Sequence, residues 1–245
     1  MSKFIRKVYI LLSLLIIILT LFIYKNNITK EKIVYSYEEI IEKIPEINYE
    51  EELNELKQQY NNNDIVATLS IENTSFNEII MQSTDNDYYL EHTVYHDYNW
   101  MGQSFLDYRL DVNNSKKLII YGHNSAYYNL PFEIFENYYN KEYLNDHKYL
   151  YLQTDKNIKI YEIFSVYVEV KDWSYYSKMN FLNDEEYYNH ILKLKNNSLY
   201  DTEIEINKDD EILIIQTCST HKDYAKYENK YLLVIGKRID EFDKK

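Results

Sequence analysis

The sequence predicts a mostly β domain with peripheral helices, either a barrel or a sandwich, that follows one apolar N-terminal segment. Short apolar runs bounded by turn residues recur from residue 65 onward, and some alternate apolar with polar side chains as half-buried strands do. Helical periodicity is confined to a few stretches. Many short strands with few helices are typical of barrels and sandwiches.

The N-terminal segment 8–24 is apolar throughout, apart from Ser13 and Thr20. Its 17 residues are at the short end of what spans a bilayer as a helix. Basic residues within 1–7 place the N-terminus in the cytoplasm by the positive-inside rule. We therefore expect a retained transmembrane signal anchor, with a cleaved secretory signal as the alternative. Both interpretations export the rest of the chain.

The expected domain organisation follows from this segment. Residues 1–7 form a cytoplasmic N-terminus, 8–24 a transmembrane span, 25–34 a linker and 35–245 an extracellular domain. The expected location is the cell membrane, as a single-pass protein with its catalytic domain outside.

Helices are expected at the start of the domain and at two later places. Residues 35–63 favour an N-terminal helical subdomain, which Pro45 divides and whose second helix opens at Asn48 or Tyr49. A plain spacer is the alternative for this stretch. Helical patterns also cover Leu130 to Asp146 and Asn183 to Leu199, the latter with acids first and lysines last, as the helix dipole prefers.

The strands are predicted from apolar runs that are bounded by turn residues. The last two predicted strands, 211–217 and 231–238, lie on either side of the only cysteine of the chain. In order, the predicted strands are Ile65–Ile71, Phe76–Met81, Ser104–Tyr108, Lys117–Tyr121, Tyr149–Gln153, Ile158–Val170, Glu211–Thr217 and Tyr231–Arg238.

The net charge limits the possible partners. The chain carries a formal charge of −13, and four of its 27 basic residues but no acid lie in residues 1–25, which leaves −17 on the remainder. Such an acidic domain is a poor electrostatic partner for nucleic acid or for an anionic membrane surface. We therefore expect no nucleic-acid partner.

The single cysteine, Cys218, follows the apolar run 211–217 at the mouth of a predicted strand. A lone cysteine excludes a disulfide within the chain. A thiol at a strand mouth can be exposed, and exposure with a lowered pKa makes a nucleophile. A buried, inert cysteine is the alternative.

A cysteine nucleophile needs a partner that transfers protons, usually histidine. Of six histidines, His123 stands out because it follows the strand 117–121 and Gly122, so that it too lies at a strand mouth. His221, three residues after Cys218, is the rival. A zinc site is disfavoured because there is one thiolate and no closely spaced histidine pair.

Three segments together resemble the sortases of Gram-positive bacteria, which are membrane-anchored cysteine transpeptidases. They are Tyr121-Gly122-His123-Asn124, Gln216-Thr217-Cys218-Ser219 and, for class B in particular, Gly102-Gln103-Ser104-Phe105-Leu106-Asp107-Tyr108-Arg109. The likeness covers roughly residues 37–239. It implies a sortase-like eight-stranded β-barrel, preceded by a transmembrane helix and two further helices.

The resemblance also implies site residues. It assigns Cys218 as the nucleophile and His123 as the general acid/base, and it requires an arginine at the start of the last strand. That position falls on Lys230 or Tyr231 here, so that the arginine is absent. Lysine is a point charge without the planar fork of arginine, which makes the exchange non-conservative.

The function implied is transpeptidation. The enzyme would cleave a C-terminal sorting signal of exported proteins, form a thioester and transfer the acyl group to an amine of a peptidoglycan precursor or a pilin. No metal or organic cofactor is implied. The absent arginine motivates an alternative, a weak or inactive sortase-like module that binds sorting signals. A third hypothesis, unrelated to this family, is an anchored extracellular sensor with a buried Cys218.

Overall fold

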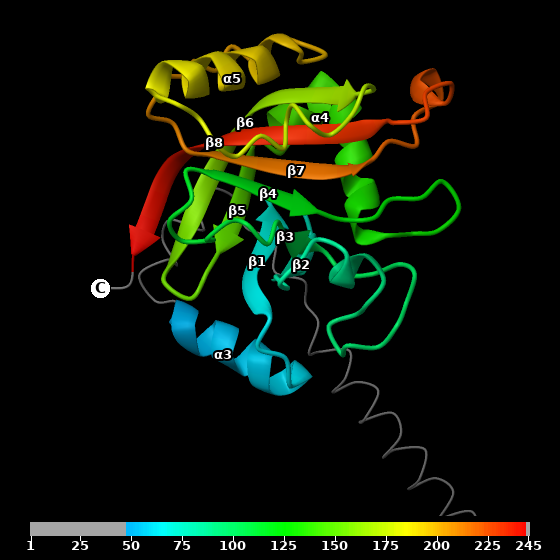
Figure 1. The fold of residues 1–245 in the computed structure, drawn as a ribbon, viewed down its shortest axis with the longest axis vertical. Helices are drawn as coiled ribbons and strands as arrows, with labels where there is room; N and C mark the ends of the chain where they lie inside the picture. Colours follow the sequence, from blue (N-terminus) through cyan, green and yellow to red (C-terminus); the bar gives the residue numbers. More distant parts are fainter. Residues whose placement is uncertain (1–47, 244–245) are drawn as a thin grey trace, which may run out of the picture. The chain divides into compact units, whose positions relative to one another are not determined.

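The computed structural model describes residues 48–243 of the chain, and these fold around a closed barrel of eight strands (Figure 1). The strand order around the barrel is β1-β2-β3-β4-β7-β8-β6-β5. The predicted eight-stranded barrel is therefore confirmed, and a sandwich is excluded. Its strands are β1 (Ile65–Ile71), β2 (Asn77–Met81), β3 (Phe105–Leu106), β4 (Lys117–Tyr121), β5 (Tyr149–Gln153), β6 (Asn157–Glu169), β7 (Ile212–Cys218) and β8 (Tyr231–Asp243).

The last strand is longer than its sequence pattern predicts. β8 continues past the expected end at Arg238 to Asp243, where it pairs with Asn157 at the start of β6. Two irregularities in this ladder let the two long strands stay paired along their whole length. The sequence pattern missed the extension because the residues after Arg238 are mostly polar and charged.

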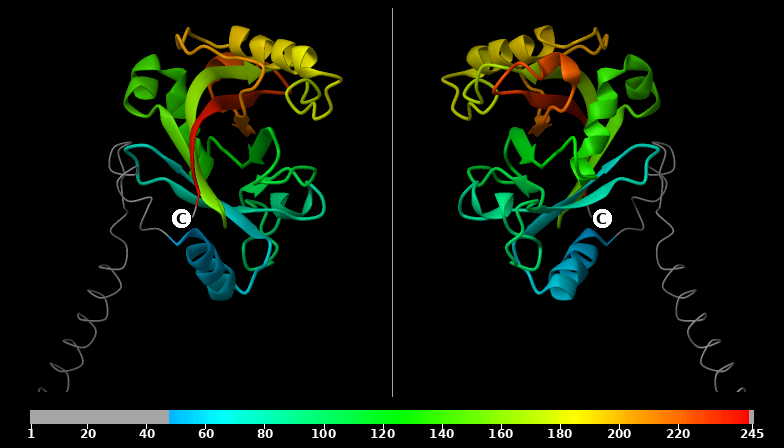
Figure 2. Two further views of the ribbon diagram at one scale, coloured as in Figure 1. Left: turned by 90° about the vertical axis from the view of Figure 1, so that its left-hand side faces the viewer. Right: turned by 90° about the vertical axis from the view of Figure 1, so that its right-hand side faces the viewer.

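The helices lie outside the barrel, and the side views place α5 over one side and α3 at the opposite end (Figure 2). The helical pattern predicted over residues 130–146 is divided between two elements. Asn140 separates them, because its backbone is extended and its side chain caps the second element, 2.8 Å from the Glu142 N–H. The helical elements are α3 (Tyr49–Tyr60), η2 (Tyr88–Leu90), η3 (Pro131–Tyr139), α4 (Lys141–Asp146), α5 (Asp184–Asn196) and η4 (Lys222–Tyr224).

The core has two layers, which explains why the central strands are apolar on both faces. Leu118 and Ile120 of β4 point into the barrel, whereas Ile119 between them packs in the outer layer. Helix α5 closes that outer layer with Ile191 and Leu194, both fully buried. Strands β4 and β7 are therefore held rigidly from both sides.

The parallel pairing of β4 with β7 positions the site. Their register runs from Lys117↔Ile212 to Tyr121↔Gln216, so that both strands end at the same edge of the barrel. The side-chain hydroxyl of Thr217 donates to the Gly122 carbonyl at 2.7 Å, which extends the contact beyond the strand ends.

The expected single-pass location in the cell membrane requires correction. Within residues 48–243, no helix is long and apolar enough to cross a membrane. Segment 8–24, from which the span was inferred, lies outside the described residues, as do segments 1–7 and 25–34 and the first helix expected within 35–63. The single-pass localisation is accordingly withdrawn.

Candidate functional site

Cys218 and His123 line one pocket at the edge where β4 and β7 end. The pocket has a volume of about 390 Å³. The Gly122 N–H donates to the Gln216 carbonyl at 3.1 Å, and this bond carries the parallel ladder one step past the strands, toward Cys218 and His123. The residues that line the pocket are Asn86, Asp87, Leu90, Phe105, Tyr121, Gly122, His123, Trp173, Tyr176, Gln216, Cys218 and Tyr231.

Gly122 is required by packing. A Cβ atom at this position would lie 2.4 Å from a ring carbon of Phe132. Positive φ is found instead at Gly102, whose φ is +56° and whose own Cβ would meet the Tyr89 carbonyl oxygen at 2.4 Å. Both glycines let neighbouring segments pack closely against the backbone, Phe132 at Gly122 and residues 89–90 at Gly102.

The thiol of Cys218 is exposed, as a nucleophile requires. The walls of the pocket still remove much of the water around it, and this partial burial raises the pKa of the thiol, while the Lys230 ammonium opposes that shift. The backbone carbonyl of Cys218 accepts a hydrogen bond from the Asn124 amide at 3.0 Å. Asn124, next to His123 in the chain, therefore ties the two strand ends together.

The orientation of His123 follows from one hydrogen bond. Its Nε2 lies 2.9 Å from the Leu90 carbonyl oxygen. A carbonyl oxygen only accepts, so Nε2 carries the hydrogen in this contact and Nδ1 is left to exchange a proton. The rival histidine, His221, does not line this pocket. It packs against the Tyr139 ring, with 4.5 Å between the ring centroids.

The two residues at the expected arginine position lie differently. Tyr231 is paired with Cys218 in the β7–β8 ladder and lines the pocket. Lys230 does not line it, but its backbone carbonyl accepts from the Ser219 N–H at 2.7 Å and its ammonium lowers the pKa of the Cys218 thiol against the larger effect of burial.

Neither arginine of the described chain reaches the pocket. Arg238 is at the far part of β8, in a 2.9 Å salt bridge with Glu211. Arg109 makes two bonds to the Asp107 carboxylate, at 2.8 and 2.6 Å. The guanidinium that the resemblance required therefore has no equivalent beside Cys218 within residues 48–243.

Asp107 is a structural centre that the sequence pattern did not single out. Its side chain is fully buried. It accepts from Arg109 and, at 3.0 Å each, from the Tyr121 hydroxyl and the Asn86 amide. Burial alone would raise the pKa of this carboxyl, but the hydrogen bonds outweigh it and hold the pKa below its usual value. Two of its partners, Asn86 and Tyr121, line the pocket of Cys218.

The opposite wall of the pocket is formed by the connection between β6 and α5. It supplies Trp173, which is 56% exposed, and Tyr176, which is buried. The ammonium of Lys117 on β4 donates to the carbonyls of Tyr176 and, at 2.8 Å, of Lys178. One sequence signal could have indicated this wall, namely the aromatic residues of 173–176 within an otherwise polar connection.

Comparisons with known proteins agree with this geometry. Residues 69–239 match the family model described as Sortase domain. Sortase B of Listeria monocytogenes is 34% identical over 167 residues, which is 67% of each chain. Sortase B of Staphylococcus aureus is 25% identical over 246 residues and 98% of each chain.

Solved structures give the same result. The X-ray structure of Clostridium perfringens sortase B has 29% identity and a TM-score of 0.68, and the match covers 76% of this chain and 99% of that one. A Staphylococcus aureus sortase B–substrate complex, at 23% identity, shares the fold with a TM-score of 0.70 over 82% of this chain and 89% of that one. The chain therefore belongs to the sortase family of cysteine transpeptidases, in its class B.

Proposed function

We propose that this sortase cleaves a C-terminal sorting signal of exported proteins through Cys218 and His123, and transfers the acyl group to an amine of a peptidoglycan precursor or a pilin. One observation carries the proposal: the only cysteine of the chain and a histidine 95 positions away line the same pocket. The pocket is open to solvent at the thiol, so that a peptide has access to it.

In the first step, Nδ1 of His123 takes the thiol proton and the sulfur attacks a carbonyl carbon of the signal, by resemblance that of its threonine. A C–S bond forms, the peptide C–N bond breaks, and the His123 proton passes to the departing amine. A base is needed because burial raises the pKa of the Cys218 thiol, which keeps the thiol protonated near neutral pH.

In the second step, the acceptor amine attacks the thioester carbonyl. A new C–N bond forms, the C–S bond breaks, and sulfur leaves as the Cys218 thiolate while the amine proton passes to His123. One sortase B structure, that of Staphylococcus aureus, is described as a substrate complex, and another sortase B structure is described as a complex with a peptide of three glycines.

Lys230 and Tyr231 divide the role of the absent arginine in this proposal. The Lys230 ammonium favours the Cys218 thiolate, since it lowers the thiol pKa against the larger effect of burial. Tyr231 is paired with Cys218 and lines the pocket, and its hydroxyl becomes the candidate donor for the oxyanion when it leaves Asn229, to which it donates at 3.3 Å in this structure.

The absent arginine also favours a second candidate, a module that binds sorting signals without turnover. The test is mass spectrometry of the full chain incubated with sorting-signal peptides, including the N-P-x-T-x type that the resemblance to class B sortases implies, beside the Cys218→Ala variant. A thioester adduct in the wild type alone supports the transpeptidase. Peptide binding without any adduct rejects the transpeptidase in favour of the binding module.

A further inference from the structure

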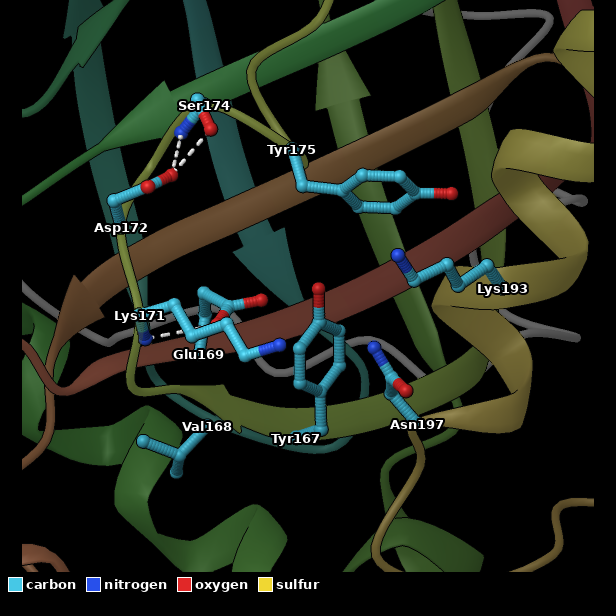
Figure 3. A pocket seen from close by; sticks show the side chains of 9 residues that line it. All are labelled: Tyr167, Val168, Glu169, Lys171, Asp172, Ser174, Tyr175, Lys193 and Asn197. Carbon is cyan, nitrogen blue, oxygen red and sulfur yellow. Dashed lines mark hydrogen bonds between the residues drawn. The ribbon is translucent and has the colours of Figure 1, made fainter.

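A second cavity lies in the layer between strand β6 and helix α5, outside the catalytic pocket (Figure 3). Its volume, about 390 Å³, matches that of the pocket around Cys218. Its walls come from the end of β6, the start of the following connection and the C-terminal part of α5. None of its residues has a role in the two steps described above.

The cavity contains a buried hydroxyl that has no partner. The side chain of Tyr167 is 3% exposed, and its hydroxyl has no hydrogen bond within residues 48–243. The Asn197 amide lies near it without reaching hydrogen-bond geometry. A buried hydroxyl without a partner destabilises the folded state, and a ligand that accepts from it removes that cost. Figure 3 shows this hydroxyl pointing into the middle of the cavity, between Asn197 and Lys171.

Two ammonium groups face the same space. Lys193 on α5 lies over the Tyr175 ring, with its Nζ 3.8 Å from the ring centroid, which orients the charge beside the cavity. Lys171 lines the cavity from the connection. No salt bridge joins either lysine to a carboxylate in the part of the chain that the structure describes. Both charges are therefore available to a ligand.

Two carboxylates complete the lining. The Asp172 carboxylate accepts from the backbone N–H and the hydroxyl of Ser174, and these two bonds hold it against the β6–α5 connection. Glu169 accepts the Lys171 N–H with one oxygen, at 3.0 Å, and lies across the Tyr167 hydroxyl from Lys193 in Figure 3. The cavity thus offers donors on one side and an acceptor on the other, as suits a peptide with a free carboxylate and N–H groups.

The cavity and the catalytic pocket share a short wall. Trp173 lines the pocket of Cys218, while its neighbours Asp172 and Ser174 line this cavity. A second connection runs through Asn229, which donates to the Lys171 carbonyl at 2.6 Å and accepts from the Tyr231 hydroxyl at 3.3 Å. A ligand that contacts Lys171 is therefore linked through Asn229, by two hydrogen bonds, to Tyr231, which is paired with Cys218.

We propose that this cavity binds the carboxylate end of the peptide that supplies the acceptor amine. The carboxylate accepts from Lys193, Tyr167 and Asn197, and a peptide N–H donates to Glu169. The amine at the other end passes residues 171–174 and attacks the thioester at Cys218, with the bond changes given above. This inference rests on the proposed function, and it assigns the acceptor to a site distinct from that of the sorting signal.

The kinetic test uses triglycine as the acceptor and triglycine amide, which lacks the carboxylate, as its matched control. In the full chain, Lys193→Gln and Tyr167→Phe are compared with Lys195→Gln, which removes the same charge from the same helix outside the cavity. The readouts are the KM for triglycine in amide product formation and the rate of thioester hydrolysis without acceptor.

We expect Lys193→Gln to raise the KM for triglycine about tenfold, as loss of a charge-assisted hydrogen bond does. Hydrolysis without acceptor stays within about twofold, Lys195→Gln behaves as the wild type, and triglycine amide shows the raised KM already in the wild type. An unchanged KM in both Lys193→Gln and Tyr167→Phe overturns the assignment. An equal rise in Lys193→Gln and Lys195→Gln also overturns it, since it indicates a long-range charge effect.

A binding measurement separates failure of this inference from failure of the proposed function. Should the wild type form no thioester, triglycine is titrated into ¹⁵N-labelled protein and the side-chain amide of Asn197 is followed by NMR. A saturable shift that Lys193→Gln abolishes supports the cavity as a carboxylate site. Absence of that shift rejects it, whatever the activity of Cys218.

Discussion

Lys117 is a charged residue that is buried on the barrel and shielded from water. It is 5% exposed on β4, and its Nζ contacts the carbonyls of Tyr176 and Lys178 and, at 3.0 Å, Nε2 of His190. Burial lowers the pKa of Lys117 from 10.5 to about 7. Repulsion from Arg109 and Lys178 adds to this shift, and attraction to Asp107 opposes it. Burial also lowers the pKa of His190 to about 3, so that the imidazole is neutral and accepts from the ammonium.

The magnitude follows from linkage between protonation and folding. A change from 10.5 to about 7 corresponds to roughly 5 kcal/mol between the charged and neutral forms. Between these two values the unfolded chain holds a proton that the folded chain releases, so stability rises with pH. From pH 7 to pH 9 the free energy of unfolding should increase by roughly 2 kcal/mol through this group. The hydrogen bonds to the ammonium favour its charged form and reduce that figure.

The assay is urea unfolding of the wild type and of Lys117→Met at pH 7, 8 and 9, with Lys226→Met as the control because Lys226 is exposed. We expect the wild type to gain stability relative to Lys117→Met as pH rises, and Lys226→Met to follow the wild type. Parallel curves for the wild type and Lys117→Met would refute the reasoning. Because Lys117 holds the Tyr176 carbonyl, the variant should also raise the KM for sorting-signal peptides.

Three further predictions concern the site. Gly122→Ala forces a methyl group into the Phe132 ring and should destabilise the protein by about 1–3 kcal/mol in urea unfolding; an unchanged midpoint would contradict the packing argument. Lys230→Met removes the charge that lowers the Cys218 pKa, so alkylation of the thiol should slow at pH 7 and its pH profile should move to higher pH, whereas Tyr231→Phe leaves that profile in place. Asp107→Asn weakens hydrogen bonds to a charged group and should cost about 2 kcal/mol in thermal unfolding; a melting temperature equal to that of the wild type would count against a structural role.

The barrel strands were predictable because their signal is local. Strands β4 and β5 have the predicted bounds, and β1 does as well, since burial on alternate or both faces imposes an apolar pattern on each segment. The strand pattern alone did not exclude a sandwich, because the choice between barrel and sandwich depends on which strands pair. The parallel neighbours β4 and β7 are separated by 90 residues of chain that carry no mark of the pairing.

The position of Cys218 and His123 at strand ends could be expected from sequence, and their common pocket is a finding of the structure. Their catalytic roles, and that of Lys230 or Tyr231, stay predictions. Asp107 was quoted only as part of a motif, because nothing local reveals that its carboxylate is buried among Arg109 and Tyr121. Trp173 was missed for a similar reason, since a connection acquires its role only where it folds back over the barrel.

The bond from Thr217 to the Gly122 carbonyl has a consequence for when the thiol becomes reactive. It joins residues 95 positions apart, so that it forms only once the chain has closed a very long loop. Before that closure, the sulfur has no imidazole of residue 123 near it and is an ordinary, weakly reactive thiol. Under the roles proposed for Cys218 and His123, chemical competence is thereby coupled to completed folding.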